Sequence, residues 1–90
     1  MVTAFVLIHV EGTRLRDVAD SLLAFPGVKE VHVVAGEYDI VAVLRVKENA
    51  QLSELITGQI IHVAGVERTK TLFALESYCE HDLSKLFGVE

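Results

Sequence analysis

The sequence contains one cysteine, one proline and no tryptophan, and aromatic residues make up only 7% of it. The lone Cys79 excludes a disulfide within the chain and a site of four thiolates, and it suits a reducing compartment. Long apolar runs are missing too, since none exceeds residues 4–8, which are far too few to cross a bilayer. Met1 is not followed by the basic start of a signal peptide. We therefore expect a cytoplasmic protein without a membrane partner.

Basic residues and catalytic motifs are also scarce. The chain has 8 Lys and Arg residues against 13 Asp and Glu residues, which gives a net charge of −5. Nucleic acid bound through its phosphates requires a basic face, so no direct contact with nucleic acid is expected. No Gly-x-Ser-x-Gly elbow, P-loop or dinucleotide fingerprint is present, and hence neither a catalytic residue nor a cofactor is predicted.

Potential metal ligands do not gather in the sequence either. The four histidines are spread over the chain without a helical i, i+4 pair: His9, His32, His62 and His81. The one compact set of ligand-type residues, 79–82, lies in a predicted solvated tail, and a metal site needs three or four converging ligands. We predict no metal site.

Hydrophobic residues, by contrast, are abundant: they fill 51% of the 90 positions, and the mean hydropathy is +0.42. A chain of this length forms one domain with one core. So short a soluble protein normally needs a more polar surface. Part of the apolar surface is therefore expected to be covered by a partner.

Periodicity predicts the order strand, helix, strand, strand, helix, strand. The strands are expected at residues 2–10, 28–35, 39–46 and 69–76, of which the first and third are apolar on both faces. Thr13 and Asn49 are predicted to cap the two helices. The inward residues follow helical spacing: Leu15, Val18, Ala19 and Leu22 in the first helix, and Leu52, Leu55, Ile56 and Ile60 in the second.

The two halves of the chain echo each other. A Gly-Val pair follows each helix, at Gly27 and at Gly65, 38 residues apart. Two such units interleave into an α+β, ferredoxin-like βαββαβ sandwich with a four-stranded antiparallel sheet, in which the first and third strands are central. Two helices cover only one face, so we expect dimerisation through the open sheet face.

Two motifs offer polar chemistry. Residues 36–39, Gly-Glu-Tyr-Asp, predict a tight turn that holds a carboxylate at the mouth of a strand. Thr69 and Thr71 present two hydroxyls on one face of the last strand. A carboxylate can hold an ammonium group and hydroxyls can hold a carboxylate, which are the two ends of an amino acid. Both motifs also have an ordinary explanation, because Gly and Asp favour turns and Thr favours strands.

Both motifs resemble those of the effector-binding domain of the Lrp/AsnC (feast/famine) regulators, known as the RAM domain. Residues 36–40 are similar to the Gly-x-Tyr-Asp turn of that family, and residues 65–71 are similar to its Pro-Gly-Val-x-x-Thr-x-Thr stretch, with Ala64 in place of the proline. The likeness covers nearly the whole chain. It implies an amino-acid effector held between subunits by residues of both motifs: Gly36, Glu37, Tyr38 and Asp39 from one subunit, and Thr69 and Thr71 from another.

The resemblance also implies stacked dimers that assemble into rings such as octamers or decamers, with full-length regulators of the family as candidate partners. Full-length members carry a helix-turn-helix domain before this module, whereas a strand is predicted here from residue 2, so a stand-alone form is expected. We assign residues 1–77 to the RAM domain and residues 78–90 to a tail with a candidate short helix around Leu83.

The predicted sheet gives its own reason for a shared site. The first strand separates the third from the fourth, so Asp39 and the two threonines would lie about 10 Å apart laterally in one chain. Two other functions stay open. A small dimeric α/β-barrel enzyme of the monooxygenase or isomerase kind would use His9 or His32 as an acid–base group in a deep cavity inside each subunit. A structural partner of full-length regulators would bind nothing small.

Overall fold

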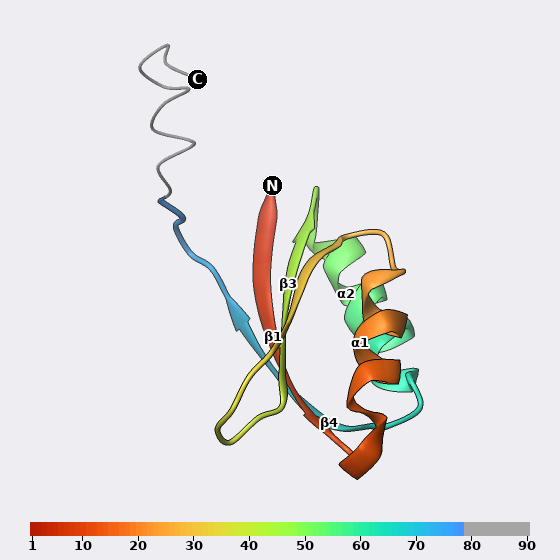
Figure 1. The fold of residues 1–90 in the computed structure, drawn as a ribbon. Coiled ribbons are helices and arrows are strands. Elements are labelled where there is room, and N and C mark those ends of the chain that lie inside the picture. Colours follow the sequence, from red (N-terminus) through yellow and green to blue (C-terminus); the bar gives the residue numbers. More distant parts are fainter. Residues whose placement is uncertain (79–90) are drawn as a thin grey trace.

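The computed structural model describes residues 1–78 and places them in two layers, a sheet and two helices packed on one of its faces (Figure 1). Short 3-10 turns precede the first helix and follow the second, at Gly12–Arg14 and Ile60–His62. The predicted ferredoxin-like order is confirmed. The elements follow one another as β1 (Val2–Val10), α1 (Leu15–Leu23), β2 (Val28–Val33), β3 (Ile40–Val46), α2 (Asn49–Gly58) and β4 (Val66–Phe73).

The sheet is antiparallel throughout, with the strand order β2-β3-β1-β4. The first and third strands are therefore central, as predicted from their two apolar faces. Ile8 of β1 lies opposite Ile40 of β3 on one side and Thr69 of β4 on the other. β4 occupies residues 66–73 instead of the predicted 69–76: its pairing with β1 ends with Phe73 opposite Ala4, and only the Ala74 N–H continues it, with a 3.0 Å bond to the Thr3 carbonyl.

Alternation along β1 separates the two faces of the sheet. Val6 and Ile8 are fully buried under the helices, whereas Phe5 and Leu7 lie on the opposite face, which neither α1 nor α2 covers. Every residue buried within the described part of the chain is hydrophobic. The core is made by these residues: Ala4, Val6, Ile8, Val10, Val18, Leu22, Val28, Ile40, Ala42, Leu44, Leu52, Leu55 and Ile60.

The sequence echo is also a structural repeat. Gly27 and Gly65 have φ angles of 99° and 100°, a region in which glycine is favoured. Each carbonyl accepts a backbone hydrogen bond of 2.8 Å, from Arg45 N–H and from Glu11 N–H respectively. An added Cβ atom would lie only 2.8 Å from Val18 Cγ2 at Gly65 and 3.0 Å from Leu55 Cδ2 at Gly27, so the loop after each helix packs closely against the core.

Both predicted helix caps are wrong. Thr13 lies inside the 3-10 turn that precedes α1, and no side chain caps that helix. α2 begins one residue after Glu48, which forms a capping box with Gln51, and the Gln51 Oε1 atom accepts the Glu48 N–H at 3.1 Å. Asn49 was predicted because asparagine is the commoner cap, yet it occupies the first helical position.

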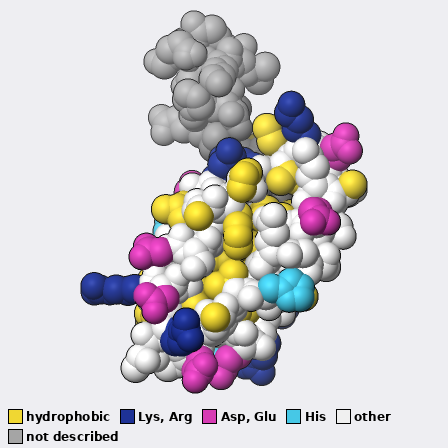
Figure 2. All heavy atoms as spheres, turned by 90° about the vertical axis from the view of Figure 1, so that its right-hand side faces the viewer, with side chains coloured by type: hydrophobic (Ala, Val, Ile, Leu, Met, Phe, Trp, Pro, Cys, Tyr) yellow, Lys and Arg dark blue, Asp and Glu magenta, His cyan; other side chains and the backbone are white. Residues whose placement is uncertain are grey.

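The two helices do not cover all of the apolar surface in their layer. Figure 2 looks onto this layer and shows an apolar strip between two flanks that carry charged side chains. Phe25, Leu55 and Val63 line grooves at the two helices. No helix within residues 1–78 combines the length and the apolar character needed to cross a membrane.

Candidate functional site

The connection between β2 and β3, residues 34–39, is a hairpin loop that projects from the sheet on the side away from the helices (Figure 1). A backbone hydrogen bond of 2.9 Å closes its base. Gly36 and Glu37 are exposed and Tyr38 is half-buried. The Gly-Glu-Tyr-Asp motif thus forms the turn that its sequence predicts, with its polar groups accessible from outside.

Asp39 ties this loop to the central strand. Its backbone N–H donates to the Ile8 carbonyl at 2.9 Å, and its Oδ2 atom accepts the Val10 N–H at 2.8 Å. The Asp39 side chain is 39% exposed, and its second oxygen, Oδ1, accepts no hydrogen bond from the described residues. The carboxylate therefore has a structural role and still offers one oxygen to a ligand.

A histidine and a second carboxylate lie next to Asp39. His9 Nδ1 is 3.0 Å from Glu67 Oε1 and 3.9 Å from Asp39 Oδ2. β4 has a bulge opposite His9 and Val10, and Glu67 is its extra residue. The bulge turns Glu67 towards the open face of the sheet, where its carboxylate reaches the imidazole. Two carboxylates thus flank one imidazole at the end of the sheet that bears the hairpin loop.

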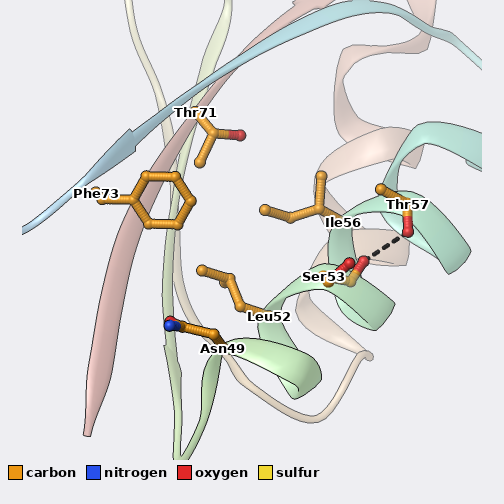
Figure 3. Close-up of a pocket in the computed structure, with 7 residues that line it drawn as sticks. All are labelled: Asn49, Leu52, Ser53, Ile56, Thr57, Thr71 and Phe73. Carbon is orange, nitrogen blue, oxygen red and sulfur yellow. Dashed lines mark hydrogen bonds between the residues drawn. The ribbon is translucent and has the colours of Figure 1, made fainter.

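Thr69 and Thr71 share one face of β4, as predicted, and that face is the one under the helices. They lie opposite Ile8 and Val6, which are both fully buried. Thr71 lines a groove of about 480 Å³ between α2 and the end of β4 (Figure 3). The complete lining of the groove is Asn49, Leu52, Ser53, Ile56, Thr57, Thr71 and Phe73.

The two motifs do not meet within one chain. Asp39 lies beside His9 on the open face of the sheet, whereas both threonines face the helices. β1 also separates β3 from β4 in the strand order. A small ligand held by Asp39 of one chain therefore cannot also touch Thr71 of that chain.

Sequence reasoning missed the groove and the contact between His9 and Glu67. The rim of the groove does leave a signal, because Asn49, Ser53 and Thr57 recur every four residues and such positions share one side of a helix. The contact made by Glu67 has no comparable signal, since it depends on a bulge in the pairing of β4 with β1.

The histidines considered as acid–base groups lie on the surface. His32 Nε2 is 2.7 Å from Glu30 Oε1 on the edge strand β2, and the side chains of His9 and His32 are 37% and 54% exposed. Among residues 1–78, no three His, Cys, Asp or Glu side chains converge as metal ligands would. The ligand-type residues 79–82 and the tail helix predicted around Leu83 lie outside the described residues.

Comparison with known proteins agrees with this architecture. Residues 3–83 match the Lrp/AsnC ligand binding domain. The chain is 31% identical over 81 residues to the HTH-type transcriptional regulator PYRAB16920 of Pyrococcus abyssi, a match that covers 87% of this chain and 54% of the relative. It therefore spans about half the length of the curated relatives it matches.

Two solved structures are also similar. TTHA0845 from Thermus thermophilus is 41% identical with a TM-score of 0.83, over 89% of this chain and 100% of that one. The feast or famine regulatory protein Rv3291c of Mycobacterium tuberculosis, solved in complex with L-methionine, is 28% identical with a TM-score of 0.74, over 89% of this chain and 54% of that one.

The family and its curated members are transcriptional regulators and not enzymes, which removes the barrel-enzyme interpretation. The matched region runs from the second residue of β1, Thr3, to beyond the end of β4 and so includes both helices. The chain therefore belongs to the Lrp/AsnC family, as a carrier of its ligand-binding domain.

Proposed function

We propose that this chain is an effector-binding and oligomerisation module of Lrp/AsnC-type regulation and that its effector is an amino acid. The observation that carries the proposal is the match of residues 3–83 to the ligand-binding domain of this family. The mycobacterial relative, solved with L-methionine, supports an amino acid as the class of effector.

The proposed site is shared between subunits. The effector ammonium binds Oδ1 of Asp39 and the backbone of the Gly36–Asp39 turn in one subunit, and the effector carboxylate binds the hydroxyl of Thr71, with Thr69 beside it, in another. The placement of the two motifs on opposite faces of the sheet supports this division. Thr71 is the better candidate of the two threonines, because it lines the groove against α2.

Self-association through the open sheet face is part of the proposal. This face carries a continuous set of apolar side chains from three neighbouring strands: Phe5, Leu7, Val41, Val43 and Leu72. At about 25 cal/mol per Å², covering several hundred square ångströms of such surface contributes many kcal/mol before the costs of association. The shared effector site requires, in addition, a second contact between subunits that brings the hairpin loop of one to the α2–β4 groove of another.

Transcriptional control by this module is proposed to act through DNA-binding members of the family. A net charge of −5 disfavours the sequence-independent binding of nucleic-acid phosphates by this chain. A role in regulation thus requires assembly with a chain or domain that reads DNA, and full-length Lrp/AsnC regulators are the candidate partners.

Calorimetry with the twenty amino acids tests the effector site. We expect at least one amino acid to bind the wild type, and both Asp39→Asn and Thr71→Val to weaken that binding by tenfold or more, since each removes a group that contacts one end of the ligand. Asparagine keeps an oxygen acceptor for the Val10 N–H, and valine keeps the shape of threonine, so the fold is retained. Absence of heat with all twenty amino acids, or unchanged heats in both variants, contradicts the proposal.

A further inference from the structure

The groove between α2 and β4 has a chemical character that bears on which amino acids could bind. Leu52, at 2% exposure, forms part of its lining, and Ile56 and Phe73 contribute further apolar surface (Figure 3). Phe73 is 60% exposed, although such a ring is usually covered in a small domain. The groove thus offers hydrocarbon surface to an occupant.

No charged side chain is among the described residues that line this groove. The polar groups at its margin are the amide of Asn49 and the hydroxyls of Ser53, Thr57 and Thr71. The Thr57 hydroxyl donates to the Ser53 carbonyl at 2.7 Å, which directs it to its own helix. An ionised group placed here would lose water without gaining a partner of opposite charge, which is unfavourable.

We propose that this groove receives the side chain of the effector and selects uncharged, aliphatic or thioether side chains over charged ones. The inference rests on the proposed function, because it takes Thr71 as the group that binds the effector carboxylate. A carboxylate on the Thr71 hydroxyl places the Cα of the ligand at the groove, whose lining also includes Leu52, Ile56 and Phe73 (Figure 3).

The size of the groove fits this occupant. Small-molecule sites in proteins typically enclose about 300–1,000 Å³, and this groove measures about 480 Å³. It is open to solvent, so its apolar side contacts the ligand while the hydroxyl margin on α2 stays hydrated. Selection should therefore depend on contact area and on charge rather than on a strict limit of length.

Two sets of ligands test the selection by calorimetry on the whole chain. The first is the series alanine, 2-aminobutyrate, norvaline and norleucine, in which affinity should rise by about fourfold per methylene if each one is buried. The second is norleucine against ornithine, which have the same length but end in a methyl and an ammonium group. We expect norleucine to bind at least about tenfold more tightly, because the ornithine ammonium meets no carboxylate.

A designed pair of variants separates side-chain selection from general weakening. Ser53 is exposed on α2 and lines the groove, so Ser53→Asp should place a carboxylate beside the ligand side chain without disturbing the core. We expect this variant to shift the preference towards ornithine by tenfold or more. The matched control, Ser53→Asn, has the same size without the charge and should keep the wild-type preference for norleucine.

The outcomes distinguish this inference from the proposed function. Equal affinities along the series and for norleucine and ornithine, with Thr71→Val still weakening every ligand, would overturn the groove as the side-chain site while the effector site stands. Binding of none of these ligands nor of any of the twenty amino acids would overturn both. An unchanged preference in Ser53→Asp would place the ligand side chain elsewhere and so would also overturn the inference.

Discussion

At the scale of single residues, Asp39 has a structural role in the fold and a proposed role in effector binding. Its Oδ2 atom accepts the Val10 N–H at 2.8 Å, and its carboxylate charge is proposed to hold the effector ammonium. The ordinary explanation of the motif as a turn and the functional one are therefore compatible. A substitution at Asp39 that removes both the hydrogen bond and the charge changes stability and binding together. A substitution that removes only the charge tests binding alone.

Stability measurements can separate the two roles of Asp39. Asp39→Ala leaves the Val10 N–H without its acceptor, and we expect a loss of about 1–2 kcal/mol in the free energy of unfolding. Asp39→Asn keeps an oxygen at the same place and should lose less than about half of that amount. Urea denaturation of the three proteins gives the comparison. Equal losses in both variants would mean that the charge, and not the hydrogen bond, stabilises the fold.

The sequence predicted which polar groups the site residues offer better than it predicted which residues surround them in the fold. Period-two alternation correctly placed Thr69 and Thr71 on a common face, but which face that is depends on the pairing of Thr69 with Ile8 of β1. Likewise, nothing local indicates that Glu67 would reach His9, because these residues are far apart in the sequence and meet through a bulge. Long-range register is the quantity that a single sequence does not specify.

At the scale of elements, the two loops that follow the helices fix how helices and strands fit together. A Cβ atom at Gly65 would lie 2.8 Å from Val18 Cγ2 and 3.1 Å from Arg14 Cβ. Val18 is fully buried, so it cannot move aside. The close approach explains why a glycine is needed there as well as the positive φ of 100°.

Gly65→Ala is therefore expected to destabilise the domain by about 2 kcal/mol or more, from left-handed backbone strain and from the displaced Val18. Gly58→Ala is the matched control, because Gly58 lies in α2 and its added Cβ meets only the end of the flexible, exposed Glu54 side chain. This control should be stabilised by about 0.5–1 kcal/mol. Thermal denaturation measures both, and a neutral Gly65→Ala would refute the packing argument.

Element types were predictable and element ends were less so. The inward stripe of α1 follows helical spacing, and its predicted members Val18 and Leu22 are fully buried. The two predicted caps failed in different ways: a 3-10 turn that contains Thr13 precedes α1, which has no side-chain cap, and at α2 Glu48 with Gln51 replaced the commoner asparagine. Local preferences of this kind differ by only about 1 kcal/mol, which tertiary packing easily exceeds.

At the scale of the whole molecule, the main feature is the open sheet face, whose apolar side chains a single chain leaves uncovered. Leu72 lies opposite Phe5 on this face and is 46% exposed. Leu72→Lys would place a charge against the partner's apolar surface, which costs several kcal/mol unless it is paired. We expect light scattering at low micromolar concentration to show a wild-type dimer or larger assembly and a mass near 9.9 kDa for this variant.

The control for that experiment is Leu75→Lys, which adds the same charge just after β4 at a side chain that is 94% exposed. It should keep the mass of the wild type, since Leu75 packs against little in the chain. A wild-type protein that elutes as a clean monomer would remove the sheet face as an interface, and the second apolar face of β1 would then need another explanation.

The central position of β1 has a consequence for the newly made chain. Among the four strands of this domain, β1 leaves the ribosome first, yet it pairs with two neighbours, and the second of them, β4, ends only at Phe73. Long loops must close before those pairs form, which makes assembly of the sheet slow compared with a local hairpin. A chain interrupted before Val66 would present the edge of β1, with its unpaired N–H and C=O groups, to other unfinished chains. Emergence of β4 from the ribosome is thus the step that protects this domain from aggregation.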